Sequence, residues 1–277
     1  MTPRSWLFVP GNSPHMMEKA RNAGADALIL DLEDAVAGSE KPAARSAVAD
    51  FLATRPKVTC HVRVNALDTG LTADDVAAVR GAADGFVLPK CEGPDDLKAL
   101  ASLTGGAPML AIATETVRAV RALMTDDWTH PALVGLAWGA EDLAADLGAS
   151  VNRDDAGTYL SPFRMARDAM LFAARAAGVA AVDAVHTDFR DTNALAAEAR
   201  AAEAIGFTAK MAIHPGQVGP INDSFTPSPE RVAWAERVVA AMAGSEGGVA
   251  SVDGRMLDRP HLRQAESILA RASVRPG

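Results

Sequence analysis

Two acidic residues follow neighbouring strands that the sequence predicts. Glu115 comes directly after the apolar run 109–114, and Asp142 follows the run 132–136 through the segment AWGAE. Side chains at the ends of neighbouring strands can converge, and two carboxylates that face one cavity repel each other unless a cation lies between them. Mg²⁺ suits such a site because it takes few protein oxygens and leaves positions open for water and substrate. Glu115 and Asp142 are therefore candidate Mg²⁺ ligands.

The same acids also have a plain structural interpretation. Glu115 and Asp142 would stand in the first turn of a helix, where the helix dipole favours negative side chains. A further acidic group, Asp31, Glu33 and Asp34 in LILDLEDAV, ends another predicted strand, where hydrogen bonds or ion pairs would account for it. Position alone favours the structural interpretation in each case.

A few other polar residues also lie near the ends of predicted elements. In the run 59–65, His61, Arg63 and Asn65 alternate with apolar residues and share one face of the strand. His214 ends the run 208–213 and precedes a proline, which is more typical of a structural hydrogen bond than of catalysis. Asp258, just before Arg-Pro, is equally suited to the N-cap of a final helix.

The elements that would position these residues alternate regularly along the chain. Eight short apolar runs of β type are separated by stretches with the 3.6-residue spacing of amphipathic helices. The runs are 6–9, 27–31, 59–65, 85–88, 109–114, 132–136, 180–185 and 208–213. Eight strands alternating with helices predict a (β/α)₈ barrel, with its chemistry at the carboxyl ends of the strands. No glycine-rich dinucleotide or phosphate fingerprint follows the early strands.

A C-terminal extension exceeds what a barrel needs. We expect the barrel to occupy 1–225 and a helical arm or lid to occupy 226–277. Within the arm, a helix over 229–242 is followed by the break GSEGG and then by a final helix over 254–272. The break suits a lid or an arm that packs on a neighbouring subunit, and a helix docked on its own barrel fits the pattern equally well.

Composition excludes several classes of protein. The 277 residues carry a net charge of -8 with no basic block, which argues against nucleic-acid and anionic-membrane partners. No apolar run reaches membrane-spanning length and the chain starts without a signal-peptide pattern, so we expect a cytoplasmic location. Cys60 and Cys91 lack metal or disulfide spacing and are predicted to be buried or half-buried.

Six motifs carry a resemblance to a known family. RSWLFVPGN, ADALILDLEDAV, HVRVN, GAEDLAADLG, KMAIHPGQV and VDGRMLDRP occur in this order. The sequence resembles the citrate lyase beta subunit and malyl-CoA lyase family, the HpcH/HpaI aldolases, from Arg4 to about Ala270. Several spaced motifs that match together are far more specific than any one of them. The resemblance implies a Mg²⁺-dependent carbon–carbon lyase and reverses the structural interpretation of the acids.

The resemblance also implies roles for individual residues. Glu115 and Asp142 would hold Mg²⁺, and Glu115 would contact substrate as well. Arg63 would bind substrate and stabilise oxyanion charge, for which a permanently charged guanidinium is suited. Asp258, on the arm of a neighbouring subunit in a homotrimer or hexamer, would move the proton at C2. We expect Arg63→Ala and Asp258→Asn to abolish turnover and leave the fold intact.

Further positions of the resemblance concern coenzyme A and the surroundings of the metal. Phe8 and Lys19 match residues that contact coenzyme A in related lyases. The position before Pro14, where coenzyme A-dependent members can carry arginine, is Ser13. Glu33 and Asp34 would lie behind the metal ligands and order metal-bound water or Arg63.

The expected substrate is a 3-hydroxyacyl-CoA thioester, which splits into an acyl-CoA and a 2-oxo acid. Malyl, methylmalyl, citramalyl and citryl thioesters all fit. Three alternatives stay open: a thioesterase of the malyl-CoA type, an aldolase acting on a free hydroxy-oxo acid, and a subunit of a citrate lyase complex whose thioester is carried by an acyl carrier protein.

Overall fold

The chain forms two compact units. The computed structural model describes residues 3–244 and 248–272, and the units divide between Asn222 and Asp223. This division lies inside helix α9 (Val218–Phe225), next to the boundary expected after residue 225. Neither described unit contains a helix long and apolar enough to cross a membrane.

The first unit alternates strands and helices along its whole length. Its elements are β1 (Ser5–Pro10), α1 (Pro14–Ala20), β2 (Ala27–Asp31), η1 (Gly38–Glu40), α2 (Lys41–Ala53), β3 (Thr59–Arg63), η2 (Leu67–Thr69), α3 (Thr72–Val79), β4 (Gly85–Leu88), α4 (Pro94–Thr104), β5 (Met109–Ile112), α5 (Val117–Leu123), β6 (Leu133–Ala137), α6 (Glu141–Leu147), α7 (Ser161–Ala177), β7 (Ala180–Asp183), α8 (Thr192–Ile205), β8 (Ala209–Ala212), η3 (Pro215–Gln217) and the start of α9. All eight predicted strands are present.

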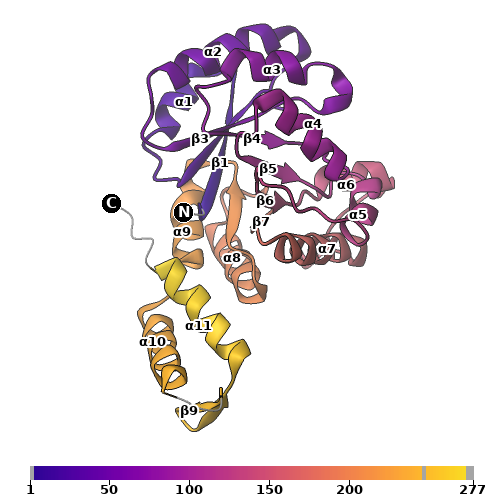
Figure 1. The fold of residues 1–277 in the computed structure, drawn as a ribbon. Helices are drawn as coiled ribbons and strands as arrows, with labels where there is room; N and C mark the ends of the chain where they lie inside the picture. The colour runs from indigo at the N-terminus through magenta and orange to yellow at the C-terminus, as the bar shows by residue number, and fades with distance from the viewer. Residues whose placement is uncertain (1–2, 245–247, 273–277) are drawn as a thin grey trace. The chain divides into compact units, whose positions relative to one another are not determined.

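The eight strands close into a parallel barrel. β1 pairs with β2 on one side and with β8 on the other, which completes the ring. Helices cover the outside of the strands (Figure 1). The register sets Asp31 beside Arg63 at the ends of β2 and β3. The predicted (β/α)₈ barrel is confirmed.

The barrel interior is filled by inward-facing apolar side chains. Inward-facing apolar residues of every barrel strand except β3 pack into one buried cluster. Its members are Trp6, Ala27, Ile29, Val87, Leu110, Ile112, Ala137, Ala180, Val182, Ala209 and Met211, with Phe8 and Val185 packed against them. His61 of β3 packs edge-on against Trp6 of this cluster. Cys60 and Cys91 are both free and buried, as predicted. A packed interior leaves only the strand ends for a site.

The second unit contains a helix, a hairpin and a helix. These are α10 (Pro229–Ala243), β9 (Ala250–Val252), β10 (Arg255–Leu257) and α11 (Arg259–Ala272). The two helices and the hairpin enclose a small apolar core of their own, which includes Val238, Leu257 and Ile268. The first helix was predicted closely.

The prediction of one helix over 254–272 is wrong at its start. Residues 255–257 form an antiparallel strand with β9, and Arg255 lies opposite Val252. The reason is the dipeptide Asp253-Gly254, whose φ angles of 53° and 74° suit the two-residue turn that joins hairpin strands. The middle of the GSEGG break, 245–247, lies outside the described residues.

Candidate active site

A small pocket opens at the carboxyl ends of the barrel strands, the end we call the mouth. It encloses about 100 Å³. Its lining residues are Phe8, Arg63, Ile112, Glu115, Trp138, Gly139, Ala140, Glu141, Asp142, Tyr159, Ala184, Val185 and Met211. The pocket brings together predicted residues from β1, β3, the end of β5 and the start of α6.

Arg63 is the buried cation of this pocket. Its Nε and Nη2 donate to the two carboxylate oxygens of Asp31 at 2.7 and 2.6 Å, and its Nη1 lies 2.9 Å from Glu33 Oε2. The guanidinium carbon lies 4.8 Å from the centre of the Phe8 ring. Burial disfavours the charge of Arg63, but Asp31 and Glu33 more than offset this and raise its pKa. Arg63 is therefore a permanent, oriented cation.

Asp31 is held in place by the loop that follows its strand. The backbone N–H groups of Glu33 and Ala35 donate to its two carboxylate oxygens at 2.9 and 3.1 Å. Gly11 N–H donates to the Asp31 carbonyl at 2.8 Å, and a Cβ on Gly11 would lie 2.6 Å from that oxygen. The structural interpretation of Asp31, a hydrogen-bonded and ion-paired strand end, holds, and its partner is Arg63.

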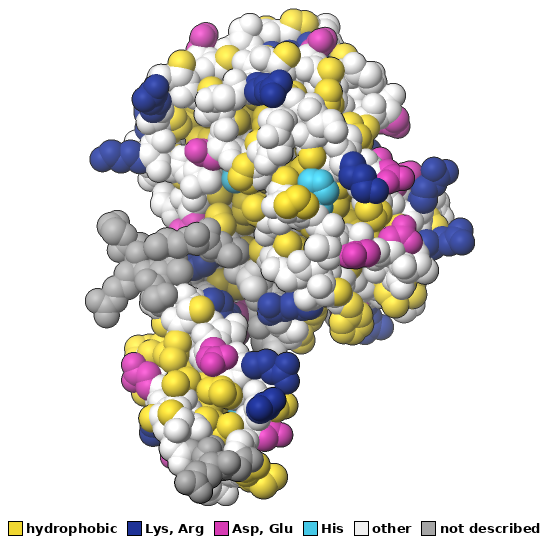
Figure 2. All heavy atoms as spheres, in the orientation of Figure 1, with side chains coloured by type: hydrophobic (Ala, Val, Ile, Leu, Met, Phe, Trp, Pro, Cys, Tyr) yellow, Lys and Arg dark blue, Asp and Glu magenta, His cyan; other side chains and the backbone are white. Residues whose placement is uncertain are grey.

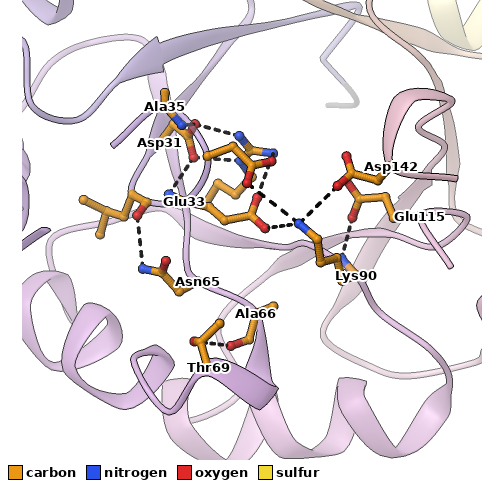
Figure 3. A network of polar contacts seen from close by, with 12 residues as sticks. Asp31, Glu33, Ala35, Asn65, Ala66, Thr69, Lys90, Glu115 and Asp142 are labelled. Atoms are coloured by element: carbon orange, nitrogen blue, oxygen red, sulfur yellow. Dashed lines mark hydrogen bonds and ion pairs between the residues drawn. The ribbon is translucent and has the colours of Figure 1, made fainter. Parts of the chain in front are cut away.

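Glu115 and Asp142 line the same pocket, and their carboxylates lie close enough to interact electrostatically (Figure 3). Glu115 is 4% exposed, and its Oε2 accepts a 2.5 Å hydrogen bond from the backbone N–H of Lys90. Burial raises the pKa of Glu115 to about 8, and the negative charges of Asp142 and Glu33 add to the effect. Asp142 lies in the first turn of α6 and is more exposed. Glu115 is therefore a buried acid, and no lysine or arginine among the described residues forms a salt bridge with it.

Lys90 is a site residue that the sequence analysis missed. It follows β4 in the segment LPK and has a left-handed φ of 49°, which is uncommon for a residue other than glycine. Its Nζ lies 2.5 Å from Glu33 Oε1 and 3.4 Å from Asp142 Oδ1 (Figure 3). Although burial lowers it, the pKa of Lys90 is raised by Glu33, Glu115 and Asp142. A polar residue at a strand end was the signal that could have found it.

The acidic surroundings can accommodate a divalent cation. Burial raises the pKa of Glu33 despite its contacts with Arg63 and Lys90, so negative charge is costly here without a further cation. In the described chain, no group of three or more His, Cys, Asp or Glu side chains forms a complete metal site. Two carboxylates with open positions for water and substrate are what Mg²⁺ requires, so Glu115 and Asp142 fit it.

The remaining predicted residues fall into two groups. Phe8 lines the pocket, and the Asp34 carboxylate lies 3.8 Å from both Arg63 and Lys90. Lys19, by contrast, is exposed on α1 and is not one of the residues that line the pocket. The structure therefore gathers Phe8, Glu33, Asp34, Arg63, Glu115 and Asp142 at the mouth.

Asp258 belongs to the second unit. It stands immediately before α11, and its Oδ1 lies 2.6 Å from His261 Nδ1.

His214 accepts a hydrogen bond from Gly216 N–H through Nδ1 and caps η3. The structural interpretation of His214 is confirmed.

Two aromatic residues of the pocket wall were also missed. Trp138 follows β6, and its Nε1–H donates to Asp183 at 2.7 Å. Tyr159 packs edge-on against Trp138 at 4.8 Å between ring centres, and the Arg153 guanidinium lies 3.6 Å from the centre of the Tyr159 ring. Tyr159 comes from the irregular segment between α6 and α7, which has no periodicity to reveal it.

Comparison with known proteins agrees with this arrangement. The model of the HpcH/HpaI aldolase/citrate lyase family matches residues 4–215. A citrate lyase subunit beta-like protein of Mycobacterium tuberculosis is 43% identical over 269 residues, with 96% of this chain and 94% of that protein covered. A (3S)-malyl-CoA thioesterase of Cereibacter sphaeroides is 36% identical, with 98% and 95% covered.

A solved structure is also similar over nearly the full length. It is the protein CitE of Mycobacterium tuberculosis in complex with magnesium, acetoacetate and coenzyme A, with a TM-score of 0.82, 39% identity and 98% of each chain covered. Family match, relatives and barrel agree, and the chain belongs to the HpcH/HpaI aldolase/citrate lyase family.

Proposed function

We propose that this protein is a Mg²⁺-dependent carbon–carbon lyase that cleaves or forms a 3-hydroxyacyl-CoA thioester. The products of cleavage would be an acyl-CoA and a 2-oxo acid. The observation that carries the proposal is the pairing, in one pocket, of the Glu115 and Asp142 carboxylates with the buried Arg63 guanidinium. The magnesium and coenzyme A named with acetoacetate for the similar CitE structure support it.

Glu115 and Asp142 are the residues that would hold Mg²⁺. When bound, the ion would act as a Lewis acid that binds oxygens of the oxo-acid half and polarises its C–O bond. The protein supplies the two carboxylates from separate elements, the end of β5 and the first turn of α6. The backbone N–H of Lys90 keeps Glu115 turned toward the pocket.

Arg63 would stabilise the charge that develops when the bond between C2 and C3 breaks. In cleavage the C3 hydroxyl loses its proton to solvent and becomes the carbonyl of the 2-oxo acid. The electron pair of the C2–C3 bond stays on the thioester fragment as an enolate, whose oxygen is negative. The guanidinium is fixed by Asp31 and Glu33 before substrate arrives, so little reorganisation is needed during the reaction. It cannot give up its proton to the enolate, because its pKa is raised further above that of a free arginine.

The rest of the pocket wall would exclude water. Phe8, Ile112, Val185 and Met211 line it with apolar groups beside Arg63. A wall of this kind strengthens the electrostatic contacts with substrate and protects an enolate from stray protons. Phe8 and Lys19 remain our candidates for coenzyme A contacts.

Asp258 would transfer the proton at C2 of the thioester. It would come from the second unit of a neighbouring subunit, in a homotrimer or hexamer. The second unit exposes apolar side chains, among them Met256 at 75%, and hydrophobic side chains are spread over its visible face (Figure 2). Such a surface supports packing against a second copy of the chain. We also propose a cytoplasmic location.

A thioesterase is the second candidate, because a relative with 36% identity carries the name (3S)-malyl-CoA thioesterase. In that reaction water would attack the thioester carbonyl, and the carbon–carbon bond would stay intact. The third candidate is a citrate lyase subunit that takes its thioester from an acyl carrier protein, which the name of the 43% identical relative supports.

Product analysis separates these candidates. Purified protein would be incubated with Mg²⁺ and malyl, methylmalyl, citramalyl and citryl coenzyme A esters, with an EDTA control, and the products resolved by mass. We expect an acyl-CoA and a 2-oxo acid that form only with metal. Free coenzyme A with an intact hydroxy acid indicates the thioesterase. No turnover of any ester contradicts both and favours a carrier-protein substrate.

A further inference from the structure

Lys90 links acidic side chains from the loop after β2 and from helix α6. Its ammonium bridges Glu33 of the β2 loop and Asp142 of α6, at 2.5 and 3.4 Å, and lies 3.8 Å from Asp34 (Figure 3). Within the described residues it is the lysine that contacts a predicted metal ligand. Its side chain therefore lies where a bound cation would also act.

The backbone and side chain of Lys90 do separable things. The backbone N–H of Lys90 donates to Glu115 Oε2. The ammonium contacts Glu33 and Asp142 instead. A substitution of the side chain removes the ammonium and keeps the N–H that orients Glu115.

The contact with Glu33 alone does not explain why the Lys90 ammonium lies at this position. Glu33 already has Arg63 Nη1 at 2.9 Å. The nearby Lys41 shows a purely structural lysine for comparison, since its Nζ donates only to the carbonyl oxygens of Leu32 and Glu33 among its recorded contacts. Lys90, by contrast, is directed at carboxylates, including one that would bind metal.

We propose that the Lys90 ammonium sets the metal affinity of the site by competing with the divalent cation for Asp142. Without metal, it partly neutralises Asp142 and Glu33. Because the ammonium lies 3.4 Å from Asp142 Oδ1, a cation held by Asp142 would be repelled by it, and this repulsion would weaken metal binding. Lys90 is thus a positioning residue that makes the metal exchangeable. The inference rests on the proposed metal site and goes beyond it.

The test is direct measurement of metal binding, with Mn²⁺ as the probe and free Mn²⁺ followed by its paramagnetic resonance signal. Metal-free wild type is compared with Lys90→Met and with Lys90→Gln, which keeps a hydrogen-bond donor near Glu33. Lys98→Met is the matched control, because Lys98 is exposed and contacts Asp95 in the same helix. Thermal unfolding verifies that each variant is folded.

We expect both Lys90 variants to bind Mn²⁺ about tenfold more tightly than wild type, and Lys98→Met to bind it equally. An unchanged or larger Kd in the Lys90 variants overturns the inference, because the ammonium would then have no effect on metal affinity or would increase it. Wild type that binds no Mn²⁺ overturns the proposed metal site as well. Absence of turnover on every thioester, with Mn²⁺ bound, affects the proposed function alone.

Discussion

Two clusters of charge in the barrel unit use similar residues and differ in balance. The mouth cluster consists of Arg63, Lys90, Asp31, Glu33, Asp34, Glu115 and Asp142. The strand-7 cluster consists of Lys210, Arg167, Arg153, Asp183 and Glu198. Acids outnumber bases in the mouth cluster, and bases outnumber acids in the strand-7 cluster.

The pKa values of buried acids shift in opposite directions in the two clusters. Burial would raise the pKa of Asp183 and of Glu198, but Lys210 and its neighbours outweigh it and both pKa values are lowered. In the mouth cluster burial prevails, and the pKa values of Glu33 and Glu115 are raised. The acids of the strand-7 cluster are neutralised within the protein, so this cluster has a structural role. The mouth cluster keeps an excess of negative charge that can bind a cation.

Removing a mouth carboxylate has the largest expected effect. Asp142→Asn should lower the Mg²⁺-dependent kcat/KM on the best thioester by on the order of 10³-fold, because Lewis-acid stabilisation is worth several kcal/mol. The neighbouring Glu141 lines the same pocket and contacts Asn152. Glu141→Gln is therefore the matched control, and it should stay within a few-fold of wild type. Wild-type turnover in Asp142→Asn contradicts the assignment.

Arg63→Lys comes next in size. It keeps a positive charge beside Asp31 but loses the two-pronged geometry, and kcat/KM should fall by about 10²- to 10³-fold. Arg63→Ala is a poorer test than the sequence suggested, because it leaves Asp31 and Glu33 buried without their main cation. We therefore expect it to lose stability as well as turnover. Rates and thermal unfolding should be measured on the same preparations.

Asp183→Asn should act on stability instead of on metal binding. It leaves Lys210, which is fully buried, short of its partner at 2.8 Å, and breaking such a pair costs about 3 kcal/mol of unfolding free energy. Urea unfolding measures the loss. An Asp183→Asn protein with wild-type stability and weakened Mn²⁺ binding would reverse the roles given to the two clusters.

The same cluster predicts a direction for acid unfolding. Because folding lowers the pKa of Asp183 and of Glu198, their contribution is fully present above the pKa of the unfolded chain and is lost as the pH falls through the folded values. Wild type should therefore lose stability below about pH 4, and Asp183→Asn should lose less over this range.

The smallest expected effect is that of Glu115→Gln on the stability of the metal-free protein, and it is an increase. Folding raises the pKa of Glu115, so its contribution is present at low pH and is lost as the pH rises through about 8. In EDTA at neutral pH the neutral glutamine should therefore stabilise the protein by about 1–2 kcal/mol. Urea unfolding of the two metal-free proteins measures it. If Glu115→Gln is less stable than wild type, the buried Glu115 carboxylate is already neutralised by other groups of the protein.

The sequence predicts the barrel well because each strand is a short apolar run between helical segments. Polar side chains at the ends of such runs make Glu115 and Asp142 candidates, and Arg63 stands near the end of the third run. Only the family resemblance favours functional roles for these residues over structural ones. The rule of polar side chains at strand ends also applies to Lys90, whose role depends on contacts with Glu33 and Asp142 that are distant in sequence.

Other features depend on geometry that the sequence pattern does not carry. Tyr159 reaches the pocket from an irregular segment, and only its packing on Trp138 shows this. The hairpin before α11 rests on the two left-handed residues Asp253 and Gly254, a turn signal that the helical pattern of the following residues obscured.

The most direct test of the contrast between the clusters is Mn²⁺ binding to metal-free wild type, Asp142→Asn and Asp183→Asn. We predict one Mn²⁺ per chain in wild type and in Asp183→Asn, with similar Kd. In Asp142→Asn the Kd should rise by about 10²-fold or more. Equal binding by wild type and Asp142→Asn would contradict the claim that the excess acids of the mouth hold a divalent cation.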